Sequence, residues 1–207
     1  MTNLYLWEWP KSFPEKWVGA HHVESIEDES FIYFSKFSRG QDLDPKTIKF
    51  VPRVNFEAKT EQLSGYDCLP CNGSAPLVNK KIIEMLREIA PGDVQFFPAR
   101  IVCLDGELEG YFFLNVTQLI KGIDHDQSVY SLLDLPGGIK MISTVRKLVL
   151  KPGCMKGHDL ARDQDLTTNL LVSQPIYDAF QAAKIKGVRL VTPDEYYEGL
   201  NALYRRG

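Results

Sequence analysis

The residues of this chain whose type and spacing come closest to a chemical motif are Cys68 and Cys71. They form a Cys-Leu-Pro-Cys sequence, a pattern typical of a redox pair or of half a zinc site. A redox pair usually opens a helix that follows a strand, whereas here an Asn-Gly-Ser-Ala-Pro segment intervenes before the next helical pattern. No second CxxC or HxxxH is present to complete four zinc ligands. The sequence therefore predicts buried or loop cysteines and no metal ion or cofactor.

None of the four histidines lies in a known catalytic sequence motif. His21, His22, His125 and His158 all lie outside a G-x-S-x-G or H-E-x-x-H pattern. A nucleophile and its base meet in space rather than in sequence, so a small hydrolase or transferase using Cys68 or Cys71 with His22 or His158 is kept as an alternative. We predict structural histidines and no enzymatic activity.

Composition narrows the class of protein. The 207 residues are 44% hydrophobic and 25% charged, with a net charge of −3, which is ordinary for a globular protein and unlike a nucleic-acid binder with a clustered basic face. No apolar run reaches the roughly 20 residues that span a bilayer, and the first residues lack a secretory pattern. We therefore predict a cytoplasmic protein with reduced cysteines.

Acidic residues gather in three short segments. Each segment can be a solvated loop, or it can form an acidic surface that meets a basic partner, because complementary charge speeds encounter. The candidate contact residues are Glu27, Asp28, Glu29, Asp105, Glu107, Glu109, Asp124 and Asp126.

The elements that must position these residues are clearest between Leu77 and Val116. Asn79 is a predicted N-cap, and apolar residues at three- and four-residue spacing predict a helix up to residue 89, ended by Pro91-Gly92. Residues 94–103 predict a strand, and a turn near Asp105-Gly106 leads towards a second strand over residues 111–116.

A similar pattern follows 94 residues later, from Leu77 to Leu171. Ser173 takes the place of Asn79, and a Gly-Val strand follows the second helix, as a strand follows the first. The polar segment 157–169 before it predicts a long surface loop or a weak helix, and residues 192–206 predict a final helix with a capping box. We predict an α+β fold in a single domain, residues 1–207, with two related helix–strand units and antiparallel sheet; about 1–56 form a strand-rich amino-terminal part.

The order of these segments resembles a known family. The residues that carry the resemblance are Asp67-Cys68-Leu69-Pro70, Leu77-Val78-Asn79, Val94-Gln95-Phe96-Phe97-Pro98, Tyr111-Phe112-Phe113-Leu114-Asn115-Val116, Leu171-Val172-Ser173 and Gly187-Val188-Arg189-Leu190. Over about residues 60–197 the chain is similar to immunity-protein family eleven of bacterial polymorphic toxin systems, formerly a domain of unknown function. Pro175, early in the second helix, and the first 55 or so residues depart from the family pattern.

The resemblance implies a non-catalytic immunity protein that binds and neutralises a cognate toxin in the bacterial cytoplasm. It brings no catalytic residues to this chain. A plain scaffold protein without a toxin partner is the third hypothesis, and the neighbouring gene distinguishes it from the first.

Overall fold

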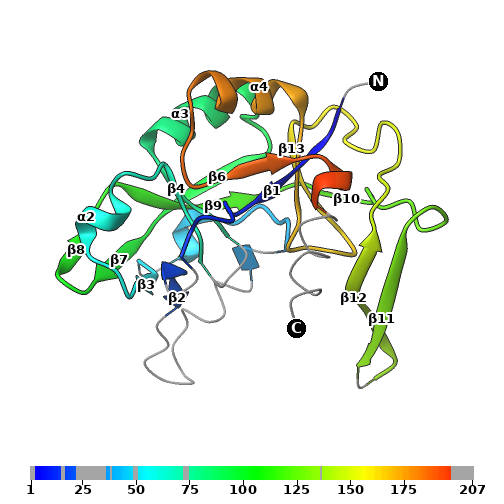
Figure 1. Cartoon of the computed structure of the whole chain (residues 1–207), viewed down its shortest axis with the longest axis horizontal. Helices are drawn as coiled ribbons and strands as arrows, with labels where there is room; N and C mark the ends of the chain where they lie inside the picture. The colour runs from blue at the N-terminus through cyan, green and yellow to red at the C-terminus, as the bar shows by residue number, and fades with distance from the viewer. Residues whose placement is uncertain are drawn as a thin grey trace.

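The computed structural model describes residues 3–14, 17–21, 36–37, 39–48, 51–71, 75–135 and 137–196. It confirms an α+β fold with antiparallel sheets (Figure 1). The helices are η2 (Pro45–Thr47, a 3-10 turn), α2 (Thr60–Leu63), α3 (Lys80–Ile89) and α4 (Gln174–Ala182). The strands are β1 (Tyr5–Glu8), β2 (Ala20–His21), β3 (Arg53–Asn55), β4 (Cys68–Leu69), β5 (Leu77–Asn79), β6 (Val94–Pro98), β7 (Arg100–Cys103), β8 (Gly106–Leu108), β9 (Tyr111–Val116), β10 (Leu119–Ile120), β11 (Val129–Leu135), β12 (Ile139–Lys147), β13 (Leu160–Asp163), β14 (Leu170–Val172) and β15 (Arg189–Val191).

The two predicted helix–strand units are present and share one topology. In the first unit the strand order is β4-β5-β9-β6, and α3 connects β5 to β6. In the second unit the order is β13-β14-β1-β15, and α4 connects β14 to β15. In each unit the two strands joined by the helix lie on either side of one antiparallel strand from elsewhere in the chain, β9 or β1.

The two units bury one common core beneath α3 and α4, which lie together on the same side of the sheets (Figure 1). Successive strand residues point to opposite faces, so alternate residues face the helices. Val78 and Val172 face the helices, while their neighbours Leu77 and Leu171 belong to two further clusters on the other side of the sheets. The helices contribute mainly Ile82, Ile83, Leu86, Ile176 and Phe180.

Asn79 confirms the predicted helix cap, and Ser173 does not act in the same way. The Asn79 side chain accepts from Ile82 N at 3.3 Å, as an N-cap should. The Ser173 hydroxyl instead donates to Asp159 Oδ1 at 2.6 Å, and makes no cap bond to α4. In the first unit, Asn79 makes the corresponding bond as well, from its amide nitrogen to Asp67 Oδ1 at 3.0 Å.

The two units contact each other at two equivalent places. The turn after α4 contacts the start of β4, because Lys186 O accepts from Asp67 N at 2.9 Å and from Cys68 N at 3.0 Å. The turn after α3 contacts the start of β13, where Asp93 Oδ2 accepts from Asp159 N at 2.8 Å and from Leu160 N at 3.1 Å. In both places, the turn after the helix of one unit accepts hydrogen bonds from backbone N–H groups at the start of the first strand of the other unit.

The predicted strand over residues 94–103 is two strands in different sheets. It breaks at Ala99, after which β7 joins a third sheet of order β2-β3-β7-β8. The turn at Asp105 consequently connects β7 to β8, and β9 pairs with β5 and β6 instead. The prediction that this turn leads directly to the strand at residues 111–116 was wrong, because Gly106–Leu108 forms a strand of its own.

The prediction of a loop or weak helix over residues 157–169 was also wrong. Residues 160–163 form β13, inside the second unit, and all four side chains are buried. Its polar residues misled the prediction: Arg162 and Asp163 are completely buried charged residues. Asp163 is satisfied by four backbone N–H groups, those of Gly122, Ile123, Asp165 and Leu166. Burial lowers the pKa of Arg162 to about 10.

The start of the last predicted helix has the capping box expected from its sequence. Thr192 N donates to Glu195 Oε2 at 2.8 Å, and Glu195 N donates to Thr192 Oγ1 at 3.3 Å. These bonds hold the pKa of Glu195 below its usual range. The rest of that predicted helix lies outside the described residues.

Candidate interaction surface

The first described acidic segment surrounds the β7–β8 turn, and its residues have different roles. Asp105 Oδ1 accepts from Thr60 N at 2.8 Å, so this carboxylate caps α2, and the bond lowers the pKa of Asp105. Glu107 pairs with Arg100, whose Nε lies 2.9 Å from Glu107 Oε1, and its pKa is lowered mainly by that bond. Glu109 is exposed, and no ion pair to it is found in the described part of the chain.

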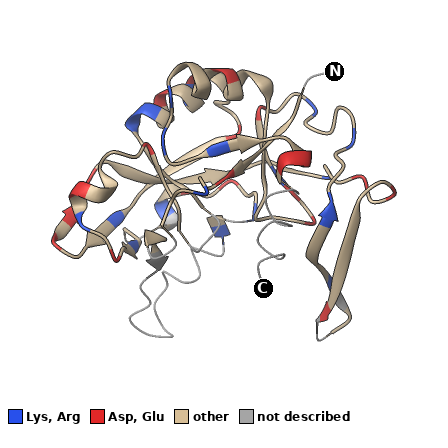
Figure 2. Ribbon diagram, in the orientation of Figure 1, with Lys and Arg blue, Asp and Glu red and all other residues tan. Residues whose placement is uncertain are grey.

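The second segment is the loop before β11. Asp124 Oδ1 accepts from the backbone N–H groups of Asp126 and Gln127, both at 3.1 Å, so it stabilises its own turn. The Asp126 side chain is exposed. The structure does not bring the two segments together, because β8 and β11 lie at opposite ends of the molecule (Figure 2). Glu27, Asp28 and Glu29 lie outside the described residues.

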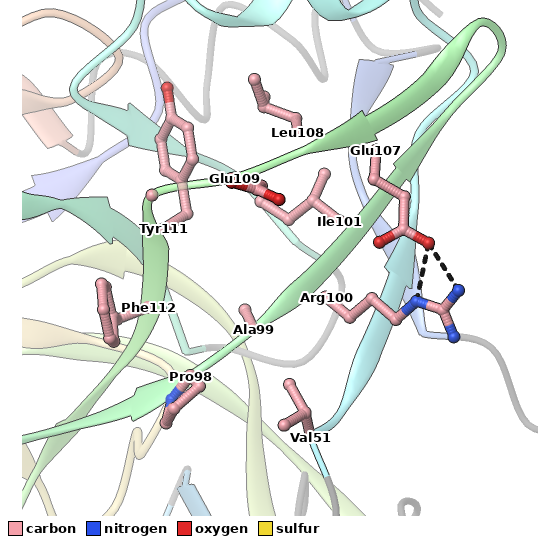
Figure 3. A pocket seen from close by; sticks show the side chains of 11 residues that line it. Val51, Pro98, Ala99, Arg100, Ile101, Glu107, Leu108, Glu109, Tyr111 and Phe112 are labelled. Atoms are coloured by element: carbon pink, nitrogen blue, oxygen red, sulfur yellow. Dashed lines mark hydrogen bonds and ion pairs between the residues drawn. The ribbon is translucent and has the colours of Figure 1, made fainter.

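A shallow hollow of about 360 Å³ lies beside the first acidic segment, where the chain passes from β6 to β7 and from β8 to β9 (Figure 3). Its lining is mostly apolar, with Arg100, Glu107 and Glu109 as the charged members. Tyr111 contributes a phenol whose hydroxyl donates to Tyr66 O at 2.5 Å, and burial raises the pKa of Tyr111 above its usual range. The described residues that line the hollow include no thiol, imidazole or serine hydroxyl.

The CxxC cysteines are both buried, as predicted from their context. Cys68 lies on β4 with no exposed surface, and Cys71 donates its thiol hydrogen to Ala75 O at 3.0 Å. Burial raises the pKa of the Cys68 thiol well above its ordinary value, so the reactive thiolate is disfavoured. Cys68 therefore packs as a small apolar residue.

Raising the pH from about 7.5 to about 9.5 is expected to lower the free energy of unfolding, in part through Cys68. Above the ordinary thiol pKa of about 8.5 the unfolded chain loses a proton that the folded chain keeps, so unfolding becomes more favourable. Urea denaturation at both pH values measures the change. Cys68→Ala should lose less stability than the parent over this interval, and an equal pH slope in both proteins would contradict the assignment.

His125 and His158 each contact a carboxylate side chain. His158 Nδ1 lies 2.8 Å from Asp93 Oδ1, next to the contact between the two units. His125 Nδ1 lies 2.7 Å from Tyr130 Oη, and its Nε2 lies 3.0 Å from Asp165 Oδ2. This exposed Tyr–His–Asp chain connects the base of β11 to the loop after β13. The His22 partner of the alternative hypothesis lies outside the described residues.

Among the described residues, no group of three or more histidine, cysteine or acidic side chains is arranged to hold a metal ion. No helix in the same residues has the length and apolar character needed to cross a membrane.

The surface that the sequence reasoning missed is the β11–β12 hairpin. It projects from the rest of the described chain and exposes large apolar side chains (Figure 1). These residues are Val129, Leu132, Leu133 and Met141. The signal in the sequence is the Pro136-Gly137-Gly138 turn between two apolar segments, which is typical of a hairpin.

Comparison with known proteins gives one family. A model described as "Immunity protein family (Imm11)" matches residues 14–193. The match extends well into the amino-terminal part that the sequence resemblance had left out. No curated protein matches the chain.

Proposed function

This chain belongs to the immunity protein family Imm11, and from that premise we propose that it protects a bacterial cell by binding one cognate toxin and blocking its action. The observation that carries the proposal is the family match, which covers both helix–strand units except strand β1, and most of the segment before the first unit. We place the protein in the cytoplasm, where its toxin would otherwise act.

We further propose that protection depends on contact alone and needs no catalysis. The described side chains support this, because the cysteines of the catalytic alternative are buried. Cys68 and Cys71 are 0% and 4% exposed, and burial raises the pKa of the Cys68 thiol well above its ordinary value, which disfavours the nucleophilic thiolate. An inhibitor needs only a complementary surface with a few buried anchors, and charges around the anchors set the association rate.

Co-expression with the product of the neighbouring toxin gene tests the function. Cells that make the toxin should survive when they also make this chain, and the two proteins should elute together from a sizing column. Cys68→Ala, Cys71→Ala and His158→Gln should protect as well as the parent if they fold. A lack of both rescue and complex would contradict the function, and loss of rescue in a folded, toxin-binding Cys71→Ala variant would contradict the non-catalytic mechanism.

Among the acidic candidates, the structure separates residues that hold the fold from residues available for contact. Asp105 and Asp124 bond to nearby backbone groups, and Glu107 is paired with Arg100. Glu109 and Asp126 are exposed, so they test the proposed acidic contact surface with the least disturbance of the fold.

Reversing either exposed charge, Glu109→Lys or Asp126→Lys, is expected to slow association with the toxin by about 3- to 10-fold at low salt. The reason is loss of electrostatic steering, so the difference should shrink as salt is added. Association rates from surface plasmon resonance measure it. Glu88→Lys, an equal charge change on exposed α3, is the matched control. Equal rates for all three variants would exclude these two residues from the contact surface.

A further inference from the structure

The β11–β12 hairpin is a two-stranded sheet with little cover. Within the described chain, neither strand has a second strand beside it. Leu132 is 51% exposed and Leu133 is 46% exposed. As neighbours on a strand they point to opposite faces, so each face of β11 carries a partly exposed leucine in this part of the hairpin. An isolated two-stranded hairpin is only marginally stable in water, and exposed strand edges invite pairing with another chain.

The two edges of the hairpin differ in regularity. Between the pairs Val129–Lys147 and Tyr130–Val145, the register skips one residue of β12, Arg146. Between Ser131–Thr144 and Leu132–Ile142 it skips Ser143 in the same strand. Both irregularities therefore lie in β12, and bulges hinder the addition of a strand. The edge of β11 is regular, and β11 is the outer strand in Figure 1.

The base of the hairpin is firmly attached, which distinguishes it from a loose loop. Ile142 is 8% exposed and belongs to the core cluster of the second unit, against which Tyr130 and Val145 also pack. Ser128 Oγ donates to Val149 O at 3.2 Å and accepts from Val149 N at 2.9 Å. Together with the His125–Tyr130 contact, these bonds hold the β11 edge in one orientation, so little entropy is lost when a partner binds there.

The charge of the hairpin indicates what kind of strand would fit. Residues 129–147 contain three basic residues, Lys140, Arg146 and Lys147, and one acidic residue, Asp134. All four are exposed. All three basic residues lie on β12, whereas Asp134 lies on β11 and is paired in register with Lys140, so the net positive charge comes from β12. That net charge opposes the pairing of two identical hairpins and favours a strand that carries acidic side chains.

We propose that the outer edge of β11 is a docking site for an acidic, partly apolar edge strand of the toxin, which extends the two-stranded sheet by one strand. Main-chain hydrogen bonds to β11 would provide affinity, and Leu132 and Leu133 would anchor side chains on the two faces. This inference rests on the proposed function, since it names the surface that the toxin uses. The β11 edge would be a second region of toxin contact, in addition to the acidic residues Glu109 and Asp126.

Hydrogen exchange on the complex of this chain with the toxin that it neutralises tests the proposal. In the free chain, amides on the outer edge of β11 should exchange quickly. In the complex they should exchange about 10-fold or more slowly. Leu132→Asp and Leu133→Asp should each weaken binding about 10-fold or more, while Leu119→Asp, at a similarly exposed leucine on β10, should leave binding unchanged. Lys140→Glu should weaken binding more at low salt than Lys80→Glu, a control on exposed α3.

The outcomes separate this inference from the function on which it rests. If no complex forms, the proposed function fails. If a complex forms but β11 amides exchange as in the free chain, or the leucine variants bind as tightly as Leu119→Asp, the β11 site is wrong. Light scattering tests whether a second copy of this chain occupies the β11 edge instead. A dimer of the chain alone, with protected β11 amides, would assign the edge to that second copy and overturn the proposal.

Discussion

Gly187→Ala is expected to destabilise the protein by on the order of 3 kcal/mol or more. Gly187 has φ of +92°, which L side chains rarely adopt, and an added Cβ would lie 1.9 Å from the carbonyl oxygen of Cys68. That oxygen belongs to the backbone, so the clash cannot be relieved by a rotamer change. The turn would have to move away from β4, breaking the bonds from Asp67 N and Cys68 N to Lys186 O. Urea denaturation followed by tryptophan fluorescence measures the loss.

Gly92→Ala is the matched control for this substitution. Gly92 occupies the equivalent helix-to-strand turn of the first unit, and no atom lies within 4 Å of its added Cβ. We expect a change of less than about 1 kcal/mol there. If both variants unfolded at the same urea concentration, the close contact between the Gly187 turn and β4 would not be a feature of the native protein.

Asp93→Ala is expected to cost about 3 kcal/mol of unfolding free energy. Asp93 is 5% exposed, and its carboxylate accepts from two backbone N–H groups, those of Asp159 and Leu160. Alanine would leave both donors without this acceptor at the start of a buried strand, and would also free His158. Loss of a buried acceptor costs more than a surface bond, because the donors stay away from water.

Two further variants show whether the lost bonds are the cause. Asp93→Asn keeps an oxygen that can accept from the backbone, so its loss should be smaller than that of alanine. Asp126→Ala removes an exposed carboxylate and should change stability by less than about 0.5 kcal/mol. Equal unfolding midpoints for the alanine variants of Asp93 and Asp126 would contradict the role of Asp93.

Local signals were enough to predict α3, α4 and the repeated unit, whereas the short helix α2 was not predicted. The Asn79 cap and the spacing of Ile82, Ile83 and Leu86 predict α3 closely, because an amphipathic helix depends on neighbours three and four residues away. The sequence similarity of residues 77–97 and 171–191 likewise predicted two related helix–strand units. The structure shows that these two units have the same strand order.

The pairing of strands that lie far apart in the sequence could not be predicted from local signals. Pro98 can end a strand, but no residue near Ala99 indicates that β6 and β7 belong to different sheets. Strand β13 looked polar because it contains Arg162 and Asp163, which are buried with hydrogen bonds to distant backbone groups or to the loop that follows β13. The candidate site shows the same limit. Sequence identified acidic residues, but Asp105 and Asp124 turned out to stabilise turns and caps, and the exposed hairpin edge depends on which strands lack a neighbour.

The origin of the two central strands has a consequence for biosynthesis. The first unit closes with β9, which follows β6 after only the short strands β7 and β8, so all the strands of this unit have been synthesised once Val116 is added. The second unit needs β1, which precedes every other described strand and pairs with β14 and β15 near the far end of the chain. The apolar Tyr5-Leu6-Trp7 segment therefore has no partner strand until β14 and β15 have been synthesised, which is late in translation. A pause in synthesis before β14 would prolong the interval in which a chaperone can bind it.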